Sequence, residues 1–300
     1  MKMSRAELIE AVGRYRWYHT IDLGEGVTTE SHVPLFKDMW AFNLKCLESV
    51  DFKGKRVLDI GCRDGLFSFE AERRGAREVI GIDNDLSTGA VELLIPHFGS
   101  KVQMRQMNLY DLTPELMGRF DVILFFGVLY HLRYPFWGLK RILDCLEDQG
   151  VLALESGMNV SPYLKDVELL ICPVERSPYN EPTSCTFFNQ LGLATTMKSM
   201  DCRLEQAWTF RPERMTAKPA RSPVARLKQL VRRIFPKLPP SGTLIHDVAR
   251  QFFLFRKEAG HAASTEYAYA TQERFSKQWT DSYWNATHDE HTCGDRKLKQ

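Results

Sequence analysis

The chain lacks the features of a membrane protein, a secreted disulfide-bonded protein or a zinc protein. No apolar run approaches the length needed to cross a bilayer, and Met1 to Glu7 show no apolar core of a secretory signal. The seven cysteines are scattered, with no Cys-x-x-Cys pair among them. This pattern is typical of reduced thiols in a cytoplasmic protein, and it predicts no metal site.

Neither sign of charge is in excess, since 40 Lys and Arg stand against 38 Asp and Glu. Overall charge therefore indicates no particular partner. One segment departs from this balance: residues 211–257 hold twelve Lys or Arg against two acids. Within it, apolar residues recur at helical spacing from Val224 to Phe235, and Pro236 follows. We interpret 223–238 as a basic helix that packs on the domain, contacts an anionic membrane surface or follows RNA phosphates.

Two apolar runs are followed by residues that suit a nucleoside. The run Val57–Ile60 leads into a turn with Gly61 and Gly65, and the run Val79–Ile82 ends in Asp83. Parallel strands joined by a helix bring such a turn and such an acid to one edge of a sheet. Glycine permits a tight turn, and a carboxylate accepts hydrogen bonds from both ribose hydroxyls. The sequence therefore predicts a nucleoside site at this edge.

The acids near the turn indicate which nucleoside binds. The third glycine of a pyrophosphate-binding loop is absent, while Asp59 lies at the strand end and Asp64 in the loop. Carboxylates repel a pyrophosphate but suit a ligand with an ammonium and a sulfonium, which is S-adenosyl-L-methionine. The segment Val57-Leu-Asp-Ile-Gly-Cys-x-x-Gly65 resembles the first motif of the class I methyltransferases.

Strand and helix patterns alternate along the chain, which predicts an α/β fold with a parallel sheet. Strands are predicted at 56–60, 78–82, 102–107, 121–126, 150–155, 203–210 and 251–256. Helices are predicted at 4–14, 33–50, 65–74, 86–97, 135–147 and 184–191. Together these elements predict a Rossmann-like class I methyltransferase with a seven-stranded, mostly parallel sheet. We expect an N-terminal helical lid (1–50), a catalytic domain (51–258) with a basic insertion (about 211–250), and a polar tail (259–300).

A second resemblance is narrower. The segments Gly127-Val-Leu-Tyr-His-Leu-Arg-x-Pro135 and Trp17-Tyr-His-Thr-Ile-Asp-Leu-Gly24 resemble bacterial enzymes related to tRNA wobble-uridine carboxymethyltransferase, over roughly residues 15–210. This resemblance implies cofactor contacts from Gly61, Asp83, Phe126 and Tyr130.

The tRNA enzyme uses a carboxylated cofactor that is held partly by a lysine. The stretch from His19 to Asp22 contains no lysine, and Asp22 would repel the extra carboxylate. We therefore expect ordinary S-adenosylmethionine. Arg211 and Arg214 are the two candidates to match an arginine of the relatives beyond the sixth strand.

The predicted site combines these motifs. The residues expected to contact the cofactor are Asp59, Gly61, Arg63, Gly65, Asp83, Asn84, Asn108, Leu109, Phe126, Gly127 and Tyr130. Asn108 either pairs with the adenine amino group or simply occupies a strand-end turn. His131 and His19 are the candidate general bases, because histidine titrates near neutrality. In the alternative, His131 caps the next helix or fills space.

Three functions remain open from the sequence. The first is methyl transfer to an oxygen or nitrogen of a small-molecule or glycan-type acceptor. The second is alkylation of the tRNA wobble uridine, and the third is a non-catalytic cofactor-binding scaffold. The oligomeric state is not predicted.

Overall fold

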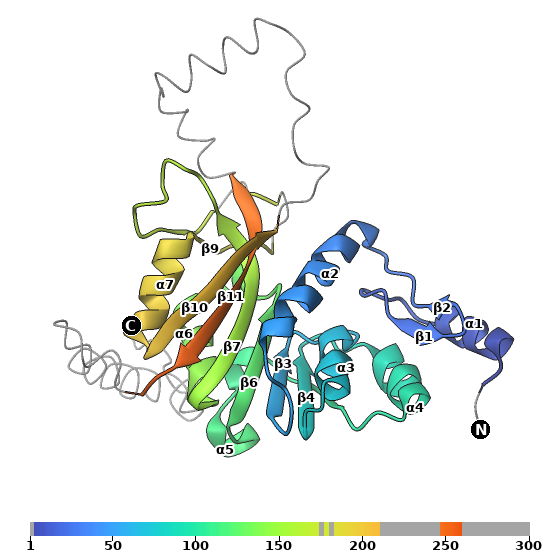
Figure 1. The fold of residues 1–300 in the computed structure, drawn as a ribbon. Coiled ribbons are helices and arrows are strands. Elements are labelled where there is room, and N and C mark those ends of the chain that lie inside the picture. Colours follow the sequence, from blue (N-terminus) through green and yellow to red (C-terminus); the bar gives the residue numbers. More distant parts are fainter. Residues whose placement is uncertain (1–2, 174–176, 180–182, 211–246, 260–300) are drawn as a thin grey trace, which may run out of the picture.

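The computed structural model describes residues 3–173, 177–179, 183–210 and 247–259 (Figure 1). Its centre is a seven-stranded sheet with the order β10-β11-β7-β6-β3-β4-β5. The strands are β3 (Arg56–Ile60), β4 (Glu78–Asp83), β5 (Gln103–Gln106), β6 (Phe120–Phe126), β7 (Leu146–Asn159), β10 (Cys202–Phe210) and β11 (Val248–Lys257). Neighbours from β7 to β5 are parallel, and β11 is antiparallel to both β7 and β10. The predicted seven-stranded, mostly parallel sheet is confirmed.

Helices and short strands surround this sheet. The α-helices are α1 (Arg5–Gly13), α2 (Lys37–Cys46), α3 (Leu66–Arg73), α4 (Ile95–Phe98), α5 (Pro114–Met117), α6 (Pro135–Asp144) and α7 (Gln190–Ser199). Tighter or wider turns form η1 (Pro34–Phe36), η2 (Leu47–Ser49), η3 (Ala90–Leu94), η4 (Leu109–Asp111) and η5 (Leu129–His131). Two small hairpins pair β1 (Asp22–Gly24) with β2 (Val27–Thr28), and β8 (Leu170–Ile171) with β9 (Phe187–Phe188).

Helices cover both faces of the sheet, because successive side chains of a strand point to opposite faces. Leu58 of β3 belongs to the core beneath α6 and α7, together with Leu139 and Leu193. Val57 belongs to the opposite core, which includes Trp40 of α2. Apolar runs without alternation, such as Val122 to Phe126, are typical of strands buried on both faces.

The N-terminal region is more than a helical lid. α1 begins with a capping box, in which Ser4 and Glu7 bond to each other's backbone N–H groups. The hairpin β1–β2 follows it, and both elements lie beside α4 in Figure 1. Leu8 and Trp17 form a separate apolar cluster there with Leu94 and other residues. The N-terminal unit is therefore anchored on the segment that follows β4.

Three predicted helices differ from the observed elements. The predicted helix at 184–191 is wrong, because Phe187 and Phe188 are buried as β9 and helix α7 begins only at Gln190. The predicted helix at 86–97 is divided into η3 and α4, where Pro96 has no N–H to donate. The predicted helix at 33–50 starts and ends in 3₁₀ turns, and Pro34 opens the first of them.

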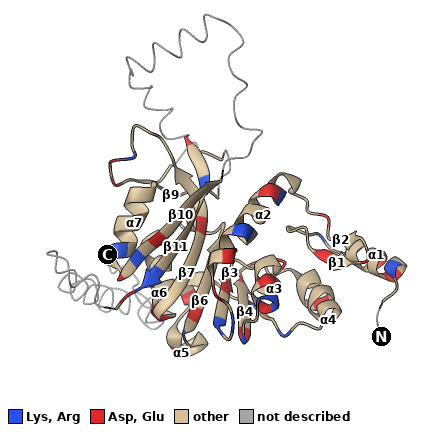
Figure 2. Cartoon of the chain, in the orientation of Figure 1, with Lys and Arg blue, Asp and Glu red and all other residues tan. Residues whose placement is uncertain are grey.

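The predicted basic helix at 223–238 lies outside the described residues, as do Arg211 and Arg214. Over the described elements, acidic and basic residues are interspersed (Figure 2). Across the same elements, no helix is both long and apolar enough to cross a bilayer.

Candidate active site

The glycine turn lies where the sequence predicted, between β3 and α3. Gly61 and Gly65 adopt φ values of 77° and 84°, in the left-handed region that favours glycine. A Cβ at Gly61 would lie 2.4 Å from the Val128 Cγ2, so the packing also requires glycine there. The N–H groups of Gly61 and Cys62 donate to the Ile82 carbonyl at 2.8 and 3.2 Å. The turn therefore folds over the end of β4.

Asp83 is the last residue of β4 and faces this turn. Its carboxylate accepts hydrogen bonds from the backbone N–H groups of Arg63 at 2.9 Å and Asp85 at 2.8 Å. Partial burial raises the Asp83 pKa, while these two N–H groups oppose that effect. A carboxylate has about four acceptor positions, so two remain beyond those used by the backbone.

Asp59 is a buried acid beneath the same turn. Its side chain is 2% exposed and accepts a hydrogen bond from the Ser68 hydroxyl at 2.6 Å. Burial raises the pKa of Asp59 to about 7, and the nearby Asp83 charge adds to this effect. Such a carboxyl group destabilises the fold when it is ionised, so we expect it to have a functional role.

The residues predicted to face the adenine follow the end of β5. The Met107 N–H donates to the Asp83 carbonyl at 2.9 Å, which brings this strand end beside the acid. Asn108 is exposed, and its side-chain oxygen accepts the Tyr110 N–H at 2.9 Å, capping η4. Leu109 is buried in the core. Asn84 is exposed, and its carbonyl accepts a hydrogen bond from the Gln106 side chain at 3.3 Å.

The end of β6 contributes aromatic side chains. Phe126 is buried against Phe67, with ring centres 4.8 Å apart. Gly127 follows with a φ of 72°, and its N–H donates to the Glu155 carbonyl at 3.0 Å. Tyr130 is buried and contacts the rings of His131, Tyr179 and Phe187.

A buried ion pair beside Tyr130 was missed in the sequence. Arg250 of β11 makes two hydrogen bonds to Glu155 of β7, at 2.5 and 2.6 Å. The Arg250 guanidinium lies 4.7 Å from the centre of the Tyr130 ring. Glu155 is an acid within the apolar run of β7, which was a visible sign in the sequence of a buried charge. Its partner Arg250 lies 95 residues away along the chain. Only the antiparallel pairing of β11 with β7 brings the two together.

The two candidate bases have different surroundings. His19 is 4% exposed, between the rings of Trp40 and Phe67, and burial lowers its pKa to about 3. His131 is exposed, and its Nδ1 lies 3.1 Å from the Thr183 carbonyl oxygen. A carbonyl only accepts, so Nδ1 carries the hydrogen and Nε2 carries the lone pair. This tautomer is the one that a base at Nε2 requires.

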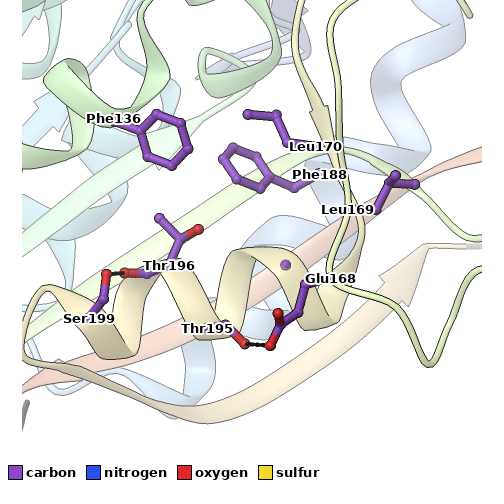
Figure 3. A pocket seen from close by; sticks show the side chains of 9 residues that line it. Phe136, Glu168, Leu169, Leu170, Phe188, Thr195, Thr196 and Ser199 are labelled. Carbon is purple, nitrogen blue, oxygen red and sulfur yellow. Dashed lines mark hydrogen bonds between the residues drawn. The ribbon is translucent and has the colours of Figure 1, made fainter. Parts of the chain in front are cut away.

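An open pocket of about 250 Å³ lies elsewhere, between α6, α7 and the hairpin β8–β9 (Figure 3). Its lining combines Phe136, Leu170 and Phe188 with the hydroxyls of α7, and Thr195 donates to Glu168 at 3.1 Å. None of the predicted cofactor or catalytic residues lines it.

The geometry fits a nucleoside cofactor that bears positive charge. Asp59, the glycine turn and Asp83 meet at the carboxyl edge of β3 and β4, with Arg63 N–H fixing Asp83. Two partly or fully buried carboxyls at this edge favour an ammonium or sulfonium over a phosphate. The residues present therefore suit S-adenosylmethionine.

Comparison with known proteins agrees with this assignment. Residues 36–207 match the methyltransferase domain family. The tRNA U34 carboxymethyltransferase of Methylococcus capsulatus is 37% identical over 105 residues, which cover 34% of this chain and 32% of that protein. The protein of the same name from Helicobacter acinonychis is 30% identical over 128 residues, covering 42% and 47%. The matched regions thus span about a third to a half of these curated relatives.

Solved structures show the same fold. The N-terminal domain of EvdMO1 with SAH bound has a TM-score of 0.57 at 15% identity, and the match covers 86% of this chain and 98% of that one. The 1,6-didemethyltoxoflavin-N1-methyltransferase of Burkholderia thailandensis has a TM-score of 0.50 at 16% identity, with coverage of 74% and 81%. The chain belongs to the methyltransferase domain family.

Proposed function

We propose that this protein transfers a methyl group to an oxygen or nitrogen of a small-molecule or glycan-type acceptor. The proposed binding of the cofactor rests on the position of Asp83, whose carboxylate is fixed by two backbone N–H groups beside the glycine turn. Its two remaining acceptor positions suit the two vicinal hydroxyls of a ribose. Asp59, Gly61, Gly65 and the end of β5 complete the proposed cofactor site.

Ordinary S-adenosylmethionine is the proposed form of the cofactor. Arg250 is the described cation beside Tyr130, and its guanidinium is paired with Glu155 through two hydrogen bonds. The pair is neutral as a whole, so it offers no net positive charge to an additional carboxylate. The exposed Asp22 side chain accepts the Gly24 N–H at 2.8 Å and supplies no cation either.

His131 is the better candidate for the base. When bound, the cofactor supplies a methyl group on a sulfonium, so the protein must orient the acceptor and receive its proton. In this role, the His131 Nε2 would receive the hydroxyl proton of the acceptor. The buried His19 accepts a proton poorly, because its pKa is about 3.

Modification of the tRNA wobble uridine is the alternative. The relatives named tRNA U34 carboxymethyltransferase favour it, at 30–37% identity over part of their length. The Glu155–Arg250 pair has no net charge, so it gives no support to binding of a carboxylated cofactor in this chain.

One experiment separates these functions. Cofactor carrying an isotopic label on its methyl group is incubated with total tRNA, with a glycan panel and with a metabolite extract, and the label is followed by mass spectrometry. Label in a small molecule or glycan supports the proposal. Label in tRNA alone contradicts it, and no transfer to any pool above a boiled-protein control favours the non-catalytic alternative.

A further inference from the structure

Asp64 is a fully buried carboxylate within the glycine turn. Its Oδ2 accepts hydrogen bonds from two consecutive backbone N–H groups of the N-terminal region, those of Tyr18 at 2.6 Å and His19 at 2.7 Å. The two partners are separated from Asp64 by 46 and 45 residues. One side chain of the turn thus holds a remote segment, residues 17–20, which we call the strap.

The strap has a defined shape of its own. The Thr29 hydroxyl donates to the His19 carbonyl at 2.7 Å and accepts the Ile21 N–H at 2.7 Å. The His32 N–H donates to the Trp17 carbonyl at 3.0 Å. These bonds all lie within residues 17–32, so they order the strap without attaching it to the glycine turn.

The turn that holds the strap is also bonded to Asp83. The Arg63 N–H donates to the Asp83 carboxylate, and the next side chain, Asp64, receives the strap. Two adjacent residues therefore connect the acid of β4 with the N-terminal region. A ligand lying on the turn beside Asp83 is next to the strap.

We propose that Asp64 is a positioning residue, which fixes the strap against the glycine turn so that the strap covers the bound cofactor and slows its release. The inference rests on the proposed cofactor site at Asp83. The physical basis is that a buried backbone N–H without an acceptor is strongly unfavourable. Without the Asp64 carboxylate, the N–H groups of Tyr18 and His19 find acceptors only when the strap moves into water.

The variants Asp64→Ala and Asp64→Asn test the role. Asparagine retains a carbonyl oxygen that can accept both N–H groups, whereas alanine retains none. The readout is the dissociation rate of S-adenosylhomocysteine, followed by tryptophan fluorescence in a stopped-flow instrument. We expect Asp64→Ala to raise this rate by about tenfold or more, and Asp64→Asn to stay within about threefold of the wild type. The KM for the cofactor should rise in Asp64→Ala with kcat at saturation little changed. Equal dissociation rates in all three proteins would overturn the proposal, as would an equal increase of this rate in both variants.

Two further measurements keep the result interpretable. The first is hydrogen exchange in the wild-type protein, which requires no variant. Bound S-adenosylhomocysteine should slow exchange in the peptide that contains Tyr18 and His19 by about tenfold relative to a β10 peptide. An unchanged exchange rate would contradict the proposal. The second is the affinity of Asp83→Ala for the cofactor, which tests the proposed cofactor site independently of Asp64. Retained affinity in Asp83→Ala refutes the proposed cofactor site itself. Lost affinity there, with unchanged release in Asp64→Ala, refutes only the role of Asp64.

Discussion

Replacing Asp59 by asparagine should change the pH dependence of folding stability. The Asp59 side chain is almost fully buried, and burial raises its pKa from the ordinary 3.8 to about 7. The folded protein therefore retains this proton up to about pH 7, while the unfolded chain loses it near pH 4. Between these values the folded state binds more protons, so the free energy of unfolding falls as the pH rises.

The size of the effect follows from this difference. One pKa unit corresponds to about 1.4 kcal/mol, so the raised pKa of Asp59 lowers the free energy of unfolding by about 4 kcal/mol above pH 7 and by about 1 kcal/mol at pH 4.5, relative to acidic pH. Asparagine removes this cost but buries an NH₂ group, at a penalty of about 1–3 kcal/mol that does not depend on pH. We expect Asp59→Asn to gain about 3 kcal/mol relative to the wild type between pH 4.5 and pH 8.

Urea unfolding of the ligand-free proteins at these two pH values measures the change. Asp166→Asn is the matched control, because its side chain is 85% exposed and the same substitution there should have almost no effect at either pH. A stability difference between Asp59→Asn and the wild type that stays constant across this range would refute the raised pKa. Such a result would also mean that Asp59 does not lower the free energy of unfolding near neutral pH.

Four further predictions concern the cofactor, the proposed base and the basic segment. Asp83→Ala should weaken S-adenosylmethionine binding in calorimetry by about 1.5–3 kcal/mol, because a charged acceptor for the ribose is lost; affinity equal to that of the wild type would exclude Asp83 from the site. Ordinary S-adenosylmethionine should bind at least as tightly as its carboxylated analogue in a competition assay, since Glu155 neutralises Arg250, and a preference for the analogue would revive the tRNA alternative. His131→Gln should lower kcat on a hydroxyl acceptor by about 10²–10⁴-fold and leave cofactor affinity intact, and an unchanged pH–rate profile would argue against a base at this position. Deleting residues 218–240 should leave cofactor affinity unchanged but reduce either turnover on the native acceptor or binding to anionic vesicles. A steep loss of vesicle binding as the salt concentration rises would identify a phosphate-binding surface. An unfolded deletion variant would show instead that the segment is structural.

The sequence by itself determined the fold class and the position of the glycine turn, where we propose that the cofactor binds. Alternating strand and helix patterns predicted the parallel sheet, and the glycines at 61 and 65 predicted a tight turn, which forms with positive φ values at both residues. These signals are local, because backbone sterics and burial act over a few residues. The predicted helix at 184–191 was wrong for the complementary reason: burial of Phe187 and Phe188 against distant elements overrides local helical preference.

Only the tertiary structure decided the environments of the charged side chains. Glu155 and Arg250 are 95 residues apart and meet through strand pairing, and Asp64 meets the N–H groups of Tyr18 and His19 through the docking of the N-terminal unit. The two histidines look equivalent in the sequence. Burial makes His19 a weak base, whereas a contact with the Thr183 carbonyl sets the tautomer of the exposed His131. Desolvation and hydrogen bonding depend on neighbours that are distant along the chain, so no local pattern could have separated them.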